Sequence, residues 1–186
     1  MLTRKPFYFL RHGQTDWNVA KRIQGQTDIP LNEFGRQQAV MASDVVGQLD
    51  IGGIFTSQLS RAFDTAAIVK PTAMTALNVV DELKEVTIGE RDGHKSGLWY
   101  QQWKAGEVII PGAETRAEFR ARVIVGVNKV LHQVENPLIV SHGGVYGALT
   151  ESIILTPEVS ITNCMLLHVT PTIDEQWLVD VVFSTD

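Results

Sequence analysis

Two short apolar runs constrain the fold of this chain more than any other feature. They are Phe7–Leu10 (FYFL) and Leu138–Val140 (LIV), and neither contains a charged residue. Strands that are apolar on both faces are typical of a sheet that lies between two layers of helices. Amphipathic stretches with a helical period separate the apolar runs. The sequence therefore predicts an α/β fold with helices on both faces of its sheet.

The other expected elements follow from apolar periodicity and from residues that begin or end helices. Asn32 and Thr15 have the pattern of helix N-terminal caps. Thr115 and Glu118 form a T-x-x-E capping box, and Pro137 is expected to end the helix that they open. The predicted strands are residues 7–10, 54–56, 138–140, 165–169 and 177–182, and the predicted helices are about 32–49, 59–69, 115–136 and 145–155, with an irregular stretch from about Met74 to Gly112.

Length and charge exclude several classes of protein. The chain has 186 residues, which suggests a single domain spanning residues 1–186. Its formal net charge is −5, so we expect neither nucleic acid nor an anionic membrane as a partner. The single cysteine, Cys164, has no partner for a disulfide and is expected to be a small buried apolar residue. No apolar stretch approaches the roughly 20 residues of a membrane span, and none has the length of a signal h-region, so the expected location is cytoplasmic.

Each of the two apolar runs ends at a histidine followed by glycine. His12 follows the first run and His142 follows the second. In α/β sheets ligands bind beyond the carboxyl ends of the central strands. A single histidine at a strand end would more often serve only to form a hydrogen bond with a backbone carbonyl. Two such histidines favour a ligand-binding site. Arg11 adds a planar fork of donors that suits phosphate oxygens. These residues alone predict an anion site built on two histidines and an arginine.

Five motifs that occur in order extend this pattern to a known family. They are Arg11-His12-Gly13-Gln14-Thr15-Asp16-Trp17-Asn18, Gly25-x-x-Asp28-x-Pro30-Leu31-x-x-x-Gly35-x-x-Gln38-Ala39, Ser57-x-x-x-Arg61-Ala62-x-x-Thr65-Ala66, Leu83-Lys84-Glu85 followed by Gly89, and Ser141-His142-Gly143-Gly144. With these motifs the chain resembles the histidine phosphatase superfamily, phosphoglycerate mutase-like branch. The resemblance extends from Phe7 to about Leu149. Arg91 departs from the family pattern, because many relatives have an apolar residue there.

The resemblance implies a fold and a domain plan. The fold is a three-layer α/β/α sandwich with a mostly parallel central sheet. The domain plan is one histidine phosphatase domain, with a variable segment at about residues 93–114 that determines substrate specificity. The implied activity is a metal-independent phosphatase without a cofactor, which hydrolyses a small phosphorylated metabolite, a phosphomonoester, through a phosphohistidine intermediate.

The resemblance also implies roles for individual residues. His12 would be the nucleophile, and Glu85 would protonate the leaving alkoxide and then activate water. Arg11, Arg61 and His142 would bind the phosphoryl oxygens and stabilise the transition state. The residues implied to contact the substrate are Asn18, Gln24, Gly25 and Gly143.

Three structural alternatives stay open. Asn18 fits a local cap as well as a ligand contact. Three acids are rivals of Glu85 for the role of proton donor, namely Glu82, Glu90 and Asp92. The cluster Trp99, Tyr100 and Trp103 fits either a lid over the site or a group packed on the sheet.

Two functional alternatives also stay open. The first is a phosphoglycerate mutase, although mutases that resemble this chain usually carry an insertion with paired arginines. Between Gly89 and Pro111 this chain has only Arg91, Lys95 and Lys104 as cations, so a phosphatase is favoured. The second is a non-catalytic module that binds phosphate or a phosphoprotein. The oligomeric state and the physiological substrate are not readable from the sequence.

Overall fold

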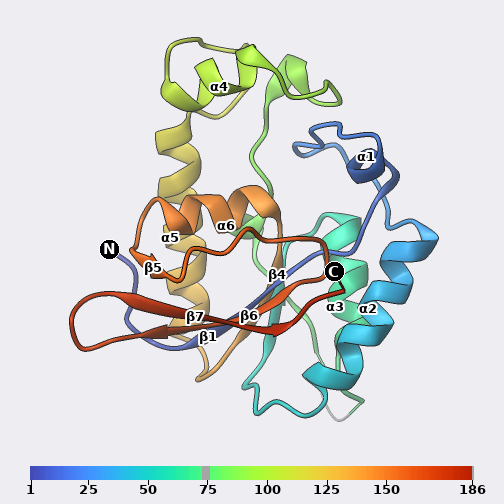
Figure 1. The fold of residues 1–186 in the computed structure, drawn as a ribbon, viewed down its shortest axis with the longest axis vertical. Helices are drawn as coiled ribbons and strands as arrows, with labels where there is room; N and C mark the ends of the chain where they lie inside the picture. The colour runs from blue at the N-terminus through green and yellow to red at the C-terminus, as the bar shows by residue number, and fades with distance from the viewer. Residues whose placement is uncertain (73–75, 186) are drawn as a thin grey trace.

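The computed structural model describes residues 1–72 and 76–185. Within these ranges seven strands form one sheet in the order β3-β2-β4-β1-β6-β7-β5 (Figure 1). The strands are β1 (Phe7–Arg11), β2 (Ile54–Thr56), β3 (Asn78–Val79), β4 (Leu138–Ser141), β5 (Leu155–Thr156), β6 (Leu166–Pro171) and β7 (Trp177–Phe183). β6 is antiparallel to β1 and β7, whereas the other neighbouring strands are parallel. The predicted mostly parallel sheet is confirmed.

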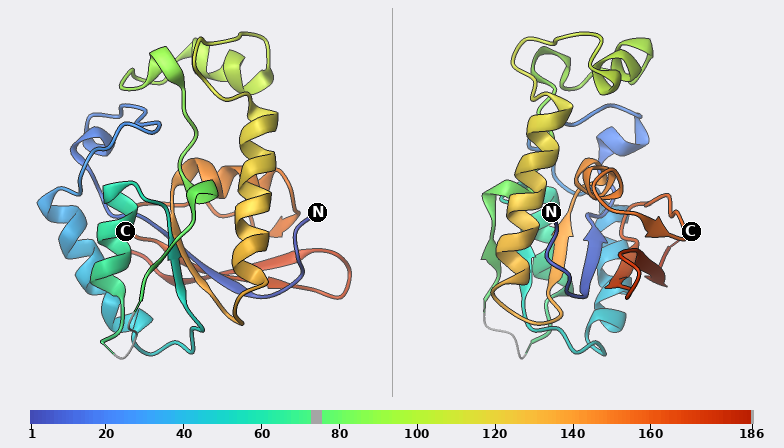
Figure 2. Two further views of the ribbon diagram at one scale, coloured as in Figure 1. Left: turned by 180° about the vertical axis from the view of Figure 1, so that it is seen from behind. Right: turned by 90° about the vertical axis from the view of Figure 1, so that its left-hand side faces the viewer.

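Helices cover both faces of the sheet, as predicted. They are α1 (Asp16–Val19), α2 (Glu33–Val46), α3 (Ser60–Val69), α4 (Leu98–Ala105), α5 (Arg116–Leu131) and α6 (Gly143–Thr150), with 3-10 turns η1 (Asp81–Leu83) and η2 (Gly89–Arg91). α2 and α3 pack together on one face, and α5 and α6 pack on the other (Figures 1 and 2). None of the helices in the described ranges has the length and apolarity of a membrane-crossing helix.

The central strands are buried on both faces because their side chains alternate between two cores. On β1, Phe7 and Phe9 join the core under α5 and α6, whereas Leu10 joins the core under α2 and α3. On β4, Ile139 joins the first core and Val140 joins the second. This two-sided burial explains why the apolar runs contain no charged residue.

The cap predictions and the cysteine prediction are confirmed. The Asn32 side chain accepts a hydrogen bond from the Gly35 N–H at the start of α2. Thr15 and Thr115 both form complete capping boxes, at α1 and α5. Cys164 is fully buried in the core under α2 and α3, and burial raises the pKa of its thiol to about 12. The thiol therefore stays protonated, which fits an apolar residue and not a nucleophile.

Three predicted helix boundaries are wrong. α2 ends at Val46 and not near Leu49, because Gly47 caps it and the chain turns there. α5 ends at Leu131, several residues before the proline that was expected to end it, and a turn follows. α6 occupies Gly143–Thr150 and not residues 145–155, because Leu155 instead pairs with β7 in strand β5.

The region predicted to be irregular contains regular elements. Its expected first residue, Met74, lies outside the described residues. The region includes β3, both 3-10 turns and helix α4, whose start at Gly97 has no side-chain cap. α4 ends at Gly106, whose φ of 75° is a left-handed cap that glycine adopts without strain.

Gly126 lets α5 pack closely against η1, and this contact generates a stability prediction. A Cβ at this position would lie 2.7 Å from Glu82 Cβ and 3.2 Å from the Glu82 carbonyl carbon. In an unobstructed helix Gly→Ala would stabilise by about 1 kcal/mol, but overpacking costs about 1–3 kcal/mol. We expect Gly126→Ala to lower the free energy of unfolding by about 1 kcal/mol in urea denaturation. The neighbouring Val125→Ala, at a half-exposed position, should change it by less than about 0.5 kcal/mol. A more stable Gly126→Ala protein would contradict the prediction.

Candidate active site

A cleft with a volume of about 730 Å³ lies where β1 and β4 end. Eight of the residues that the sequence singles out line it, namely Arg11, His12, Asn18, Gln24, Gly25, Arg61, Glu85 and Gly143. His142 does not line the cleft but lies behind His12, fully buried, with 5.2 Å between the two ring centroids. The fold thus brings all nine residues into one region.

The pairing of β1 with β4 brings the two histidines together. Arg11 lies opposite Ser141 in the parallel register, and the His12 N–H donates to the Ser141 carbonyl over 2.9 Å. Both strands run in the same direction, so the residues that follow them emerge at the same edge of the sheet.

The imidazole of His12 is held as a neutral group in one tautomer. Its Nδ1 lies 2.7 Å from the Gly13 carbonyl oxygen, which can only accept, so Nδ1 carries the proton. Burial, Arg61 and Arg11 hold the pKa of His12 well below its ordinary value of 6.5. The neutral ring therefore keeps its lone pair on Nε2.

His142 is neutral for similar reasons. Its Nε2 is hydrogen-bonded to Ser57 Oγ over 2.8 Å, which fixes the ring orientation. Burial, and after it Arg61 and His12, lower the pKa of His142 well below 6.5. Ser57 belongs to the same sequence motif as Arg61.

Backbone carbonyls hold the two arginines in the site. Arg61, fully buried at the start of α3, donates to the Thr27 and Gly25 carbonyls over 2.9 and 2.8 Å. Arg11 donates to the Ile161 carbonyl over 2.9 Å. Burial lowers the pKa of both guanidinium groups, and the charge of Glu85 opposes this. Both side chains are charged at neutral pH because an arginine pKa starts so high.

Polar atoms without protein partners gather in this region. In the described part of the chain, six buried side-chain polar atoms have no hydrogen-bond partner, and four belong to predicted site residues. These four are Arg11 Nε, Arg61 Nε, His142 Nδ1 and Gln24 Oε1. Buried polar groups are normally paired, so a concentration of unpaired ones indicates a polar ligand site.

Glu85 lies in the cleft with its carboxylate oriented by two backbone donors. Oε1 accepts from the Val86 N–H and Oε2 accepts from the Gly144 N–H, each over 2.9 Å. A Cβ on Gly144 would lie 2.0 Å from Glu85 Oε1, so only glycine allows this approach.

The three rival acids do not line the cleft. Glu82 is paired with Lys129, and Glu90 is exposed. Asp92 Oδ1 accepts from the Ile88 N–H over 3.0 Å, and burial raises the pKa of Asp92. Of the four candidate proton donors, Glu85 is the one that the cleft exposes to a ligand.

The remaining candidates show how the wall of the cleft is built. Asn18 serves as a cap, because its Oδ1 accepts from the Thr15 N–H, and it also lines the cleft. Gly25 has a φ of 53°, and a Cβ there would lie 1.9 Å from Asp92 Oδ1, so both its conformation and its surroundings require glycine. A Cβ on Gly143 would be 3.4 Å from the Arg11 guanidinium.

The aromatic cluster of α4 divides between two roles. Tyr100 lines the cleft and stacks on Trp103, with 5.5 Å between centroids. Trp103 is buried and donates to the Glu114 carbonyl, whereas Trp99 packs against Tyr100 and the Arg91 guanidinium. α4 lies beyond the N-terminal end of α5 (Figure 1), and its cluster joins the apolar core under α5 and α6 through the buried Trp103. Arg91, the departure from the family pattern, supports Trp99 and does not line the cleft.

Sequence reasoning missed the far wall of the cleft. This wall includes Tyr146 and Thr150 on α6 and residues 158–161 in the following loop. The spacing of four between Tyr146 and Thr150, just after the second histidine motif, is a helical signal that would have found them. Within residues 1–72 and 76–185, no group of three or more His, Cys, Asp or Glu side chains is arranged to hold a metal ion.

Known proteins are similar to this chain over nearly its whole length. The probable phosphoglycerate mutase GpmB of Salmonella choleraesuis (strain SC-B67) is 31% identical over 187 residues, which covers 92% of this chain and 86% of that protein. The structure of a mycobacterial glucosyl-3-phosphoglycerate phosphatase in complex with VO3 superposes with a TM-score of 0.78 at 28% identity, over 95% of this chain and 98% of the other. YhfR of Bacillus stearothermophilus gives a TM-score of 0.80 at 25% identity, over 95% and 96% of the two chains.

The family model of the histidine phosphatase superfamily (branch 1) matches residues 7–182. A match of this extent turns the resemblance seen in the five motifs into an assignment. The chain belongs to the histidine phosphatase superfamily, in its branch 1.

Proposed function

We propose that the protein is a phosphatase that hydrolyses a small phosphomonoester through a phosphohistidine on His12. The observation that carries this proposal is the state of His12: a neutral imidazole, its Nδ1 proton held by the Gly13 carbonyl, with Arg11 and Arg61 beside it. A histidine attacks phosphorus only through an unprotonated nitrogen, and this arrangement reserves Nε2 for attack.

The proposed reaction has two steps. The first step starts from the substrate complex with Glu85 protonated. The Nε2 lone pair of His12 forms a bond to phosphorus, the bond from phosphorus to the alcohol oxygen breaks, and Glu85 gives its proton to that oxygen. In the second, Glu85 takes a proton from water as the water oxygen bonds to phosphorus and the bond to Nε2 breaks. Phosphate leaves and both side chains return to their initial states.

The two arginines, together with the neutral His142, stabilise the charge that develops on phosphorus. Arg11 and Arg61 each have a buried Nε–H without a protein acceptor, and His142 has an Nδ1 without a partner. Donors that are fixed before the reaction stabilise a transition state without further reorganisation. Asn18 adds a donor, and Gln24, Gly25 and Gly143 shape the wall around the phosphoryl group.

A mutase is the second candidate, because a relative at 31% identity is called a probable phosphoglycerate mutase. In the segment between Gly89 and Pro111, Lys104 lines the cleft, whereas Arg91 packs on Trp99. Arg22 also lines the cleft, but its Nε donates to the Gly93 carbonyl and its guanidinium packs on Trp17. Lys104 alone is a poor holder for the second phosphate that a mutase retains. Incubation with a phosphoglycerate separates the candidates: a phosphatase releases inorganic phosphate, and a mutase produces the isomer.

The first prediction concerns the covalent intermediate. Rapid quenching with a labelled aryl phosphate in the presence of EDTA should trap an acid-labile, alkali-stable phosphoenzyme, with a burst of the aryl product. His12→Ala should abolish the label, and His132→Ala, a change of an exposed histidine, should retain it. A non-catalytic phosphate-binding module would give no burst. Label that survives His12→Ala would refute the assignment of the nucleophile.

The second prediction concerns Glu85. An alkoxide is a poor leaving group and needs a proton, whereas p-nitrophenolate leaves without one. Glu85→Gln should therefore slow hydrolysis of glycerol phosphate by about 10²–10⁴-fold and that of p-nitrophenyl phosphate much less. Glu90→Gln, at an exposed position, is the control and should leave the ratio of the two rates unchanged. Equal losses on both substrates would assign the proton transfer to another residue.

The third prediction concerns pH and stability. The pKa values of His12 and His142 are lowered on folding, so below about pH 6.5 the unfolded chain binds protons that the folded protein excludes. The stability that the neutral histidines contribute is complete above this pH and decreases as the pH falls. In urea denaturation from pH 8 to 5, the advantage of wild type over His142→Gln should shrink by up to about 1.4 kcal/mol per pH unit below 6.5. An advantage that is constant over this range would contradict the prediction.

A further inference from the structure

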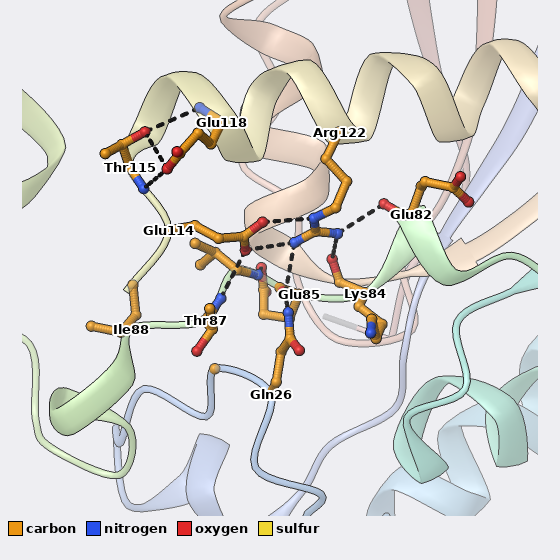
Figure 3. Close-up of polar contacts among 12 residues, drawn as sticks. Gln26, Glu82, Lys84, Glu85, Thr87, Ile88, Glu114, Thr115, Glu118 and Arg122 are labelled. Atoms are coloured by element: carbon orange, nitrogen blue, oxygen red, sulfur yellow. Dashed lines mark hydrogen bonds and ion pairs between the residues drawn. The ribbon is translucent and has the colours of Figure 1, made fainter. Parts of the chain in front are cut away.

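The segment that carries Glu85 has few backbone partners of its own. It runs from Glu82 in the short turn η1 to Thr87, and three of its carbonyls face α5. The Arg122 guanidinium donates to all three: to the Glu82 and Lys84 carbonyls through Nη1, each over 2.9 Å, and to the Glu85 carbonyl through Nη2 over 3.2 Å (Figure 3). One side chain thus replaces the ladder of hydrogen bonds that a neighbouring strand would give.

Glu114 fixes the orientation of this guanidinium. Arg122 Nε donates to Glu114 Oε1 and Nη2 donates to Oε2, each over 2.7 Å (Figure 3). The five N–H groups of Arg122 are therefore all used, two on the carboxylate and three on the segment. The planar fork of arginine makes this pattern possible, and a lysine cannot reproduce it.

Glu114 also bonds the segment directly. Its Oε2 accepts from the Thr87 N–H over 3.1 Å, and its own N–H donates to the Thr87 carbonyl over 3.0 Å. The pair Arg122 and Glu114 therefore holds the backbone on both sides of Glu85. Gln26 adds one more bond, from its Nε2 to the Glu85 carbonyl over 3.0 Å.

The position of the Glu85 carboxylate depends on this backbone. One of its two orienting bonds comes from the Val86 N–H within the segment, and the other comes from the Gly144 N–H on α6. If residues 84–87 shift, the carboxylate cannot keep both bonds. Neither Arg122 nor Glu114 lines the cleft, so they act on a ligand only indirectly, and Glu85 is the ionisable cleft residue whose backbone they hold.

We propose that Arg122, oriented by Glu114, is a positioning residue that holds Glu85 in place for proton transfer to the leaving group. This inference rests on the proposed function of Glu85. A misplacement of about 1 Å from a change outside the reacting groups can cost about 10²-fold in rate. The loss should therefore fall on the step that needs the proton, whereas a merely stabilising ion pair would affect all substrates alike.

The test compares glycerol phosphate with p-nitrophenyl phosphate. Arg122→Gln and Arg122→Lys should each lower kcat/KM for glycerol phosphate by about 10–100-fold and that for p-nitrophenyl phosphate by about threefold or less. Arg122→Lys should lose the selective rate although it keeps the positive charge, because lysine lacks the planar set of guanidinium donors. When Glu85→Gln is already present, adding Arg122→Gln should lower kcat/KM for glycerol phosphate by less than about threefold further, because both changes remove the same proton transfer.

Arg116→Gln is the matched control. Arg116 is another arginine of α5, and it forms a two-point pair with Glu151 away from the segment. This variant should keep the wild-type ratio of the two substrates. If Arg122→Gln does not fold, Glu114→Gln provides the same comparison. It removes the carboxylate but leaves the Arg122 guanidinium and its bonds to the carbonyls, so we expect a smaller selective loss on glycerol phosphate.

The outcomes separate the two proposals. An active wild type, together with Arg122 variants that keep its substrate ratio or lose both activities equally, overturns the positioning role and leaves the phosphatase intact. A wild type that hydrolyses neither substrate overturns both. A selective loss in the Arg122 variants that disappears in the Glu85→Gln background supports the positioning role.

Discussion

The parallel pairing of β1 with β4 is the constraint on which the site depends. The register that places Arg11 opposite Ser141 also brings His12 and His142 to ring centroids 5.2 Å apart. Both strands are buried on both faces, so a slip of one residue would turn Phe9 and its neighbours toward the wrong core. The packing of the two cores therefore fixes the positions of the catalytic candidates.

The same burial determines the electrostatics of the site. Two guanidinium groups and two imidazoles share one small region, so the imidazoles stay neutral and the charge resides on the arginines. Buried donors without partners destabilise a folded protein. Backbone carbonyls offset part of this cost, as the bonds from Arg61 to Gly25 and Thr27 show. A phosphoryl group would bring the acceptors that the remaining donors lack, so the arrangement disfavours the folded chain alone but favours an anionic ligand.

Much of the fold and of the site was predictable because the signals are local. A strand that ends in His-Gly, a capping box or an apolar run is visible in a few consecutive residues. Helix α4 was missed because its first residues carry no side-chain cap, and its final signal is a single glycine, Gly106. Arg122 carries no local sequence signal, since its partner carbonyls belong to a segment far away in sequence. The need for glycine at Gly126 and Gly144 also arises from contacts between distant elements, which no local pattern reveals.

Glu114 connects the part of the cleft wall that contains Tyr100 with the segment that carries Glu85. Glu114 holds Arg122 and Thr87, and its carbonyl also accepts from Trp103 Nε1 over 3.0 Å. Trp103 in turn stacks on Tyr100, which lines the cleft. Glu114 therefore anchors both the segment that contributes Tyr100 to the wall and the segment that carries Glu85. The Glu114 carbonyl bonds the α4 side, whereas its N–H and its carboxylate bond the segment that carries Glu85. If Glu85 transfers the proton as we propose, Glu114 links the shape of the wall to the geometry of that transfer.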